Sequence, residues 1–267
     1  MKEIILPPPL KTAVLFTMLG LGDNISCNGM ARYLLREHKL DKIIVIAWAH
    51  YAEQVRYMYR DDPRIEVHSV NSGNEYNDAI GIIRHALPSY LYLIGHTIYP
   101  GKDFKEAILP ETEYYQYSYT DMIDRYPTFD CHQMYYDCIN IPFQNRFDDF
   151  YLERDIQEEQ RVFSKLNPTC EDYIFIQDDS SRGYNINIDT DLKIIRNDTT
   201  ESIFHYYSII QYAKEVHVME SSFRCLIETI PTDHVKFYLH EFRNTHNLTF
   251  GNQINKGATR KDWIVIK

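Results

Sequence analysis

The sequence lacks the segments that membrane insertion and export require. No run of about 18 or more apolar residues occurs among the 267 residues, so no segment is expected to span a membrane. The opening stretch MKEIILPPPL holds one lysine and a short apolar patch that three prolines end, which is not the pattern of a signal peptide. We therefore expect a cytoplasmic protein.

Positive charge is also scarce. The chain has 28 lysines and arginines against 38 aspartates and glutamates, and its formal net charge is −10. This balance argues against a general nucleic-acid binder, because binding to a phosphate backbone relies on a surplus of basic side chains. It still permits a local basic pocket that holds one anionic small molecule.

Common metal and nucleophile motifs are missing too. The five cysteines show no CxxC spacing and the histidines show no metal-ligand spacing, so no metal site is expected. An odd number of scattered cysteines is typical of a reducing compartment. The GxSxG, P-loop and HExxH motifs do not occur either.

The chain does contain a regular alternation of apolar strands and helices. Strands are predicted at residues 13–18, 42–48, 65–70 and 90–94, and again at 173–177, 192–195, 215–219, 235–239 and 263–266. Helices of about ten residues between apolar strands indicate parallel sheets that are buried on both faces. The stretch 113–134, rich in tyrosine and acidic residues, is predicted to be less regular.

We therefore expect an α/β protein built from two Rossmann-like domains, with residues 1–150 in the first and 151–267 in the second. The junction is predicted near residues 149–155. The two parallel sheets are expected to face a central cleft, because ligands of such sheets bind beyond the carboxyl ends of the strands.

The first candidate site segment is GLGDN, residues 20–24, directly after the first strand. Asp23 is well placed to act as a base, and Gly22 would let the backbone approach a ligand. The alternative is that Asp23 and Asn24 cap a helix that begins near Ile25. The segment is not the dinucleotide fingerprint, which needs a third glycine.

The second segment is QDDSSRGY, residues 177–184, at the end of a predicted strand. Arg182 could bind a diphosphate through two hydrogen bonds, each worth about 1.5–3 kcal/mol. The alternative is an exposed turn in which this arginine pairs with Asp178 or Asp179.

The third segment is ESSFR, residues 220–224, between a strand and a helix. Hydroxyls and backbone N–H groups at a helix start can bind phosphate oxygens, and Glu220 can accept a hydrogen bond from a sugar hydroxyl. The alternative is plain N-capping by Ser221 or Ser222.

Two further features receive mainly structural interpretations. Residues 140–147 are predicted to cross between the domains, with Arg146 on the surface or paired with Asp148. His96 follows the strand at 90–94 and is a candidate for lining the cleft, although a lone histidine is more often structural.

Together these segments resemble the GT-B glycosyltransferases, especially the heptosyltransferase-like enzymes of family 9 and related fucosyltransferase-like proteins. The resemblance is carried by LGDN at 21–24 with CNG at 27–29, by SSF at 221–223 and by YIFIQDDSSRGY at 173–184. In that group the aspartate of the first turn is the proposed base, and a hydroxyl-bearing helix start holds the diphosphate of the donor.

The resemblance implies a hexosyl- or pentosyl-type glycosyltransferase. It would move a sugar from a nucleotide-diphosphate sugar to a hydroxyl of a glycan or sugar acceptor, with Asp23 as the general base. The nucleotide sugar is a co-substrate, and no metal or other cofactor is expected. The residues assigned to substrate and donor binding are Gly20, Gly22, Asn24, His96, Asp179, Arg182, Glu220, Ser221, Ser222 and Phe223.

Two other functions are weighed against this one. A non-catalytic nucleotide- or sugar-binding module would share the fold without the chemistry. A nucleotide-sugar epimerase or dehydrogenase would need a full GxGxxG and a Tyr-x-x-x-Lys pair, and Tyr173 and Tyr212 lack a lysine four residues later. The sequence DTD at 189–191 resembles a metal-binding DxD motif, but it precedes a predicted strand and is interpreted as a turn.

Overall fold

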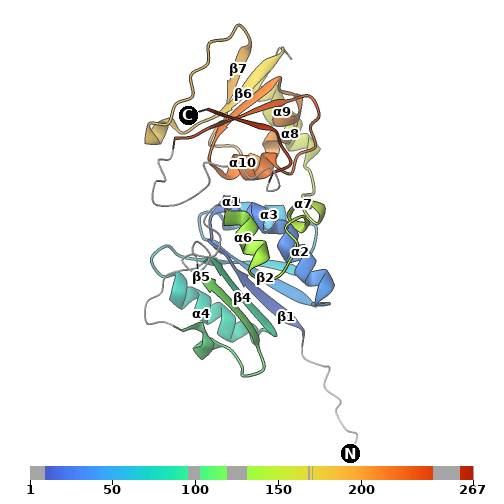
Figure 1. Cartoon of the computed structure of the whole chain (residues 1–267), viewed down its shortest axis with the longest axis vertical. Coiled ribbons are helices and arrows are strands. Elements are labelled where there is room, and N and C mark those ends of the chain that lie inside the picture. Colours follow the sequence, from blue (N-terminus) through green and yellow to red (C-terminus); the bar gives the residue numbers. More distant parts are fainter. Residues whose placement is uncertain are drawn as a thin grey trace, which may run out of the picture.

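The computed structural model describes residues 10–95, 103–118, 131–167, 169, 171–242 and 259–266. Figure 1 shows two α/β units, each built on a five-stranded parallel sheet. The first sheet has the order β3-β2-β1-β4-β5 and the second the order β10-β9-β8-β6-β7. This confirms the predicted α/β class with two Rossmann-like units. The strands are β1 (Thr12–Phe16), β2 (Lys42–Trp48), β3 (Ile65–Val70), β4 (Tyr90–Gly95), β5 (Glu113–Ser118), β6 (Tyr173–Gln177), β7 (Lys193–Arg196), β8 (Glu215–Met219), β9 (Lys236–His240) and β10 (Trp263–Ile266).

The helices fall between these strands. The α-helices are α1 (Leu21–Ser26), α2 (Asn28–Glu37), α3 (Ala52–Met58), α4 (Glu75–Ala86), α6 (Cys131–Asp137), α7 (Asn145–Asp148), α8 (Ile156–Leu166), α9 (Tyr207–Tyr212) and α10 (Ser222–Ile227). The described part of the chain also contains three short 3-10 helices: η1 (Phe104–Ala107), η2 (Ser180–Arg182) and η3 (Ile203–Tyr206).

One strand of the first sheet was not predicted. β5 has the sequence EYYQYS and pairs in parallel with β4 at the sheet edge. Its tyrosines are only half buried, so the segment has no continuous apolar run of the kind that marks the inner strands. The stretch 113–134 is therefore more regular at its start than its composition indicates.

The strands of the first sheet send alternate side chains to two different cores, as the pleat requires. Ala13 and Leu15 of β1 join the largest apolar cluster, whereas Val14 and Phe16 pack on the opposite face with α4 and η1. The largest cluster continues through α1 and α10 into the second sheet. The two sheets thus share one continuous core between them, and Figure 1 shows α10 lying against α1 there.

The connection between α7 and α8 is tied to both units. The side chain of Asn28 donates to the backbone oxygen of Tyr151 and accepts from its nitrogen, each at 3.1 Å. Farther along, Arg154 forms a bidentate ion pair with the buried carboxylate of Glu159. The predicted junction at 149–155 lies between the two sheets, while the exact boundary at residue 150 stays a prediction.

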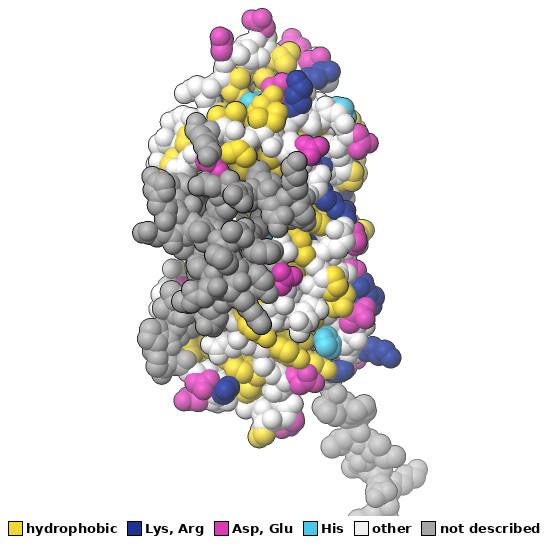
Figure 2. All heavy atoms as spheres, viewed as in Figure 1, with side chains coloured by type: hydrophobic (Ala, Val, Ile, Leu, Met, Phe, Trp, Pro, Cys, Tyr) yellow, Lys and Arg dark blue, Asp and Glu magenta, His cyan; other side chains and the backbone are white. Residues whose placement is uncertain are grey.

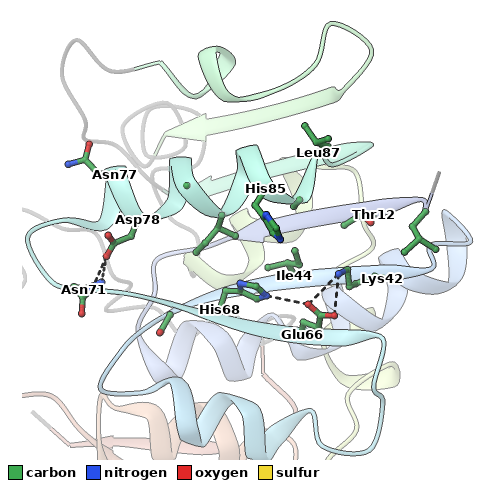
Figure 3. A pocket seen from close by; sticks show the side chains of 15 residues that line it. Thr12, Lys42, Ile44, Glu66, His68, Asn71, Asn77, Asp78, His85 and Leu87 are labelled. Carbon is green, nitrogen blue, oxygen red and sulfur yellow. Dashed lines mark hydrogen bonds and ion pairs between the residues drawn. The ribbon is translucent and has the colours of Figure 1, made fainter.

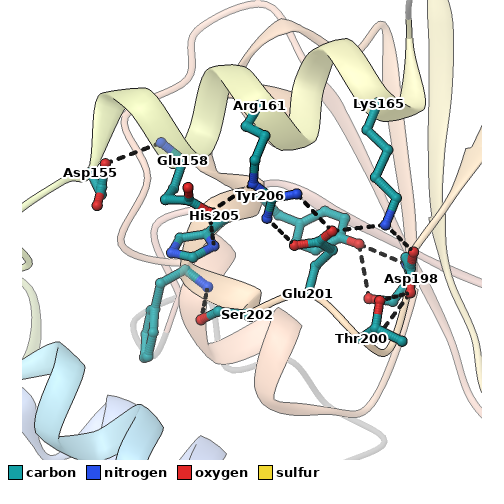
Figure 4. Close-up of polar contacts among 11 residues, drawn as sticks. Asp155, Glu158, Arg161, Lys165, Asp198, Thr200, Glu201, Ser202, His205 and Tyr206 are labelled. Carbon is teal, nitrogen blue, oxygen red and sulfur yellow. Dashed lines mark hydrogen bonds and ion pairs between the residues drawn. The ribbon is translucent and has the colours of Figure 1, made fainter.

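A cluster of charged side chains joins α8 to the segment before η3 in the second unit (Figure 4). Lys165 pairs with Asp198 at 2.7 Å and with Glu201 at 2.8 Å, and Arg161 also pairs with Glu201. These contacts lower the pKa of Glu201 to about 2, mainly through the hydrogen bonds from Arg161 and Lys165. The cluster ties α8 to the segment that leads into η3, and η3 packs on Tyr57 of α3 in the first unit.

Two observations bear on membranes and nucleic acid. None of the helices in the described part of the chain is long and apolar enough to cross a bilayer. On the face drawn in Figure 2, lysine and arginine side chains lie dispersed among aspartates and glutamates. The described residues on that face therefore form no continuous basic surface.

Candidate active site

The turn after β1 leads directly into α1. Leu19 takes a left-handed backbone conformation, with φ of 66°. Gly20, by contrast, has φ of −65° and precedes the first helical residue, Leu21. The sharp bend therefore occurs at a leucine, which is uncommon and occurs mostly where the surroundings hold the strained conformation in place.

Gly20 is important for the site because it has no side chain. A Cβ atom on Gly20 would lie 2.5 Å from Oδ2 of Asp23. The glycine thus makes room for the Asp23 carboxylate, and a larger residue would displace it.

The helix begins earlier than expected. α1 begins at Leu21, so Asp23 stands in its first turn and neither Asp23 nor Asn24 caps a helix near Ile25. The capping alternative is therefore wrong. Asn24 instead donates through Nδ2 to the backbone oxygen of Gly20 at 2.9 Å. Its Oδ1 is buried and has no hydrogen-bond partner among the residues that the structure describes.

Asp23 is surrounded by side chains of α6 that the sequence analysis did not single out. The Tyr135 hydroxyl donates to Oδ1 of Asp23 at 3.0 Å, and Nε2 of His132 lies 3.7 Å from the same oxygen. Burial raises the pKa of Asp23, while a charged His132 and the Tyr135 hydrogen bond oppose that rise. The spacing of three residues places the side chains of His132 and Tyr135 on one helix face, but this spacing does not point to Asp23.

The second sheet contributes α10 to the same place. A Cβ atom on Gly22 would lie 3.2 Å from Sγ of Cys225 and 3.4 Å from Cα of Ser222. Gly22 therefore lets α1 and α10 pack backbone against backbone. The predicted first and third segments are brought together by this contact.

The three residues at the start of α10 differ in what they contact. Ser221 donates its hydroxyl hydrogen to Oε1 of Gln177 at 2.6 Å and makes no side-chain capping bond. Ser222 is half buried beside Gly22. Phe223 packs into the core against Phe175, with ring centroids 5.8 Å apart. Glu220 is half buried immediately before this turn.

The second predicted segment, residues 177–184, forms a turn with contacts between its own residues. Arg182 pairs with Asp179 at 2.5 Å, and its side chain is 53% exposed. Gly183 has φ of 78°, and Asp179 forms an isolated bridge with Tyr184. This geometry is that of the alternative, an exposed turn with an arginine–aspartate pair. A role for Arg182 in phosphate binding stays a prediction. His96 lies outside the described residues.

The expectation for Arg146 is corrected. Its side chain is neither exposed nor paired with Asp148, which instead contacts Arg260. Arg146 is 2% exposed and lies over the rings of Phe143 and Phe147. A Cβ atom on Gly29 would lie 2.1 Å from the backbone oxygen of Asn145, so α7, which carries Arg146, packs closely on α2.

A groove of about 900 Å³ lies elsewhere, on the far side of the first sheet beside α4 (Figure 3). Its rim carries Glu66, which pairs with Lys42 at 3.2 Å and with His68 at 3.2 Å. Neither Asp23 nor α10 lines it. Within the described residues, no group of three or more potential ligands could hold a metal ion.

Comparison with known proteins identifies the fold. No protein-family model matches this sequence, and the search of curated proteins found no match. Among solved structures, the chain is similar to a family 9 glycosyl transferase from Veillonella parvula, with a TM-score of 0.61 and 11% identity over 96% of this chain and 85% of that one. It is also similar to ADP-heptose LPS heptosyltransferase II from E. coli, with a TM-score of 0.57 and 10% identity over 96% and 90% of the two chains.

These likenesses show the fold. The chain has the GT-B architecture, and the predicted resemblance to the heptosyltransferase-like enzymes of family 9 is confirmed at the level of structure.

Proposed function

We propose that this protein is a glycosyltransferase that moves a sugar from a nucleotide-diphosphate sugar to a hydroxyl of a glycan or sugar acceptor, without a metal. One observation carries the proposal: the partly buried Asp23 carboxylate stands where α1 meets α10, at the contact of the two sheets. The fold shared with a family 9 glycosyl transferase supports the same reading.

Asp23 is suited to the role of general base. Its raised pKa brings the carboxylate closer to the range in which a base accepts a proton efficiently. Tyr135 orients Oδ1, and Oδ2 lies beside Gly20. In the proposed step Asp23 takes the acceptor hydroxyl proton, the oxygen bonds to the anomeric carbon, and the nucleoside diphosphate leaves.

The donor would lie on the second unit. We propose that its diphosphate is held by the hydroxyl of Ser222 and by Arg182, which would have to leave Asp179. The hydroxyl of Ser221 donates a hydrogen bond to Gln177, so we expect Ser221 to stabilise the turn and not to contact the ligand. Glu220 is a candidate acceptor for a sugar hydroxyl of the donor.

The experiment pairs donor binding with transfer. A thermal-shift screen would use ADP, GDP, UDP, CMP and dTDP sugars, with ADP sugars first because one structural neighbour is an ADP-heptose enzyme. A true donor at a hundredfold excess over its Kd stabilises the folded state by about 2.7 kcal/mol. Transfer of the labelled sugar would then be assayed with and without EDTA, and we expect no loss of rate with EDTA.

Replacement of the base is the decisive variant. Asp23→Asn is expected to lower kcat by about 10²–10⁴-fold, because a general base contributes that much, while donor binding persists. Asp189→Asn removes an exposed carboxylate of the DTD turn and is expected to leave kcat unchanged.

Two results would contradict the proposal. Transfer by Asp23→Asn at a rate near that of the unaltered protein would show that Asp23 is not the base. Donor binding without transfer to any sugar or glycan acceptor would favour the non-catalytic binding module instead.

A further inference from the structure

His132 lies close to groups from two other helices. Its Nε2 atom lies 3.7 Å from Oδ1 of Asp23 on α1 and 4.0 Å from Sγ of Cys225 on α10. The histidine itself belongs to α6, and its side chain is only 11% exposed. One imidazole thus touches both the proposed base and the helix supplied by the second sheet.

The contact to Cys225 depends on the close packing of the two sheets. Gly22 has no Cβ, and this lets α10 approach until Cys225 and Ser222 lie against α1. Tyr135, one helical turn after His132, donates to the same Asp23 oxygen that His132 faces. The same imidazole nitrogen, Nε2, therefore faces both the carboxylate of Asp23 and the thiol of Cys225.

We infer that His132 is a positioning residue for the proposed reaction, which keeps the Asp23 carboxylate ionised and in place through direct contact with its Oδ1 atom. This inference rests on the proposed function, in which Asp23 is the base. It adds a residue from a different helix, with a role that is separate from proton abstraction.

The electrostatics of the surroundings agree with this role. Burial raises the pKa of Asp23, and a protonated His132 is the largest influence that lowers it. Burial also raises the pKa of Cys225, but His132 and two nearby arginines outweigh it, and the thiol pKa lies below its ordinary value. The titratable and charged groups that face this cluster are Cys27, Tyr135, Arg146, Cys225 and Arg224.

The sign of the effect follows from the charges. An opposite charge within about 4–6 Å favours the ionised carboxylate and lowers its pKa by about 1–3. Removal of the imidazole should therefore raise the pKa of Asp23. Because only the ionised base accepts a proton, the acid side of the pH profile of kcat should move to higher pH.

The test measures Asp23 without relying on turnover. Carbon-13 NMR of the aspartate carboxyls would follow the Asp23 pKa in the full chain, with Asp23→Asn used to assign its signal. We expect His132→Gln to raise this pKa by about 1. His132→Lys restores a positive charge and should bring the pKa back toward that of the unaltered protein.

The control is a histidine far from the site. His85 is exposed on α4 beside the groove of Figure 3, and His85→Gln should leave the Asp23 pKa unchanged. If His132→Gln unfolds the chain, the Asp23 pKa can still be compared between His132→Lys and the unaltered protein. The inference requires these two pKa values to agree, because lysine supplies the same positive charge.

The outcomes separate this inference from the proposed function. An unchanged Asp23 pKa in His132→Gln overturns the inference, even if Asp23→Asn abolishes transfer. A raised pKa together with a shifted acid side of the kcat profile supports it. A raised pKa together with undiminished transfer by Asp23→Asn would mean that Asp23 is not the base, and the inference would then fall with the proposed function.

Discussion

Two loops of this protein follow strand ends and carry similar residue types, yet their surroundings differ. The loop after β1 delivers Asp23 into the contact between the two sheets, where Tyr135 and α10 meet it. The loop after β6 turns back on itself, and Arg182 pairs with Asp179 three residues earlier.

The difference teaches what makes a strand-end loop part of a site. Both loops have a glycine, an acid and small polar residues, so their local patterns are alike. The first loop leads into a helix that packs against α10 of the other unit, because Gly22 permits backbone contact with Ser222. A loop that satisfies its own charges in solvent must break those contacts before it binds a ligand.

The largest expected effect concerns the packing that supports the first loop. A Cβ atom on Gly29 would lie 2.1 Å from the backbone oxygen of Asn145, so α2 and α7 would have to separate. We expect Gly29→Ala to lower the free energy of unfolding by about 3 kcal/mol, at the upper end for overpacking. Chemical denaturation measures it.

Gly81 on α4 provides the matched control. A Cβ atom there meets nothing within 4 Å, and Gly81→Ala should stabilise the helix by about 0.5–1 kcal/mol. Equal stability of the Gly29→Ala and Gly81→Ala proteins would contradict the view that the first loop is held by tight packing.

The second loop should respond to backbone conformation instead. Gly183 has φ of 78° and open space around it, so Gly183→Ala adds no clash but forces a left-handed alanine. We expect a loss of about 1–2 kcal/mol in thermal or chemical unfolding. Gly183→Asn should lose less, because asparagine tolerates this region, and an equal loss in both variants would argue against a backbone cause.

Arg182 tests whether the second loop binds the donor at all. Its side chain is 53% exposed, so loss of the pair with Asp179 should change the free energy of unfolding by less than about 1 kcal/mol. We expect Arg182→Ala to raise the donor Kd about tenfold, the equivalent of one charged hydrogen bond. Titration calorimetry measures the Kd, and an unchanged value would remove Arg182 from the donor site.

The smallest effect lies in the charged cluster of Figure 4, away from both loops. Glu201 has its pKa lowered to about 2 from an ordinary 4.5, so its contribution to stability is full above about 4.5 and is lost as the pH falls toward 2. Glu201→Gln should cost on the order of 1 kcal/mol at neutral pH.

The pH dependence itself provides the check on Glu201. The free energy of unfolding, measured with urea, should differ less between Glu201→Gln and the unaltered protein as the pH is lowered from 4.5 to 2. A difference that persists undiminished at pH 2 would mean that the ionised carboxylate is not its source. Activity should be unaffected by Glu201→Gln, since Glu201 pairs with Arg161 and Lys165 of α8 and not with a residue of the candidate site.

Much of the fold could be predicted from the sequence because the inner strands are continuous apolar runs. The inner strands β2, β6 and β8 begin and end at the predicted residues, and so do the edge strands β3 and β10. β5 was missed because its sequence, EYYQYS, contains no run of apolar residues and its tyrosines are only half buried. α1 begins before its predicted start because tertiary packing, and not a capping side chain, determines where it starts.

Only part of the candidate site could be predicted from the sequence. Asp23 and the serines of α10 lie in recognisable strand-end turns, so their residue types drew attention. His132 and Tyr135 lie on a helix far along the chain, and no local pattern links them to Asp23. Their contacts arise from long-range packing, which spacing along the chain does not encode.

The sequence by itself determined that the chain forms two parallel sheets with helices between strands, because apolar periodicity is a local property that neighbouring residues carry together. Only the tertiary structure decided that Asp23 meets α6 and α10 while Arg182 stays with Asp179. The physical reason is that burial and the identity of a partner depend on how the two sheets pack, and a pKa or an ion pair exists only once that packing is set.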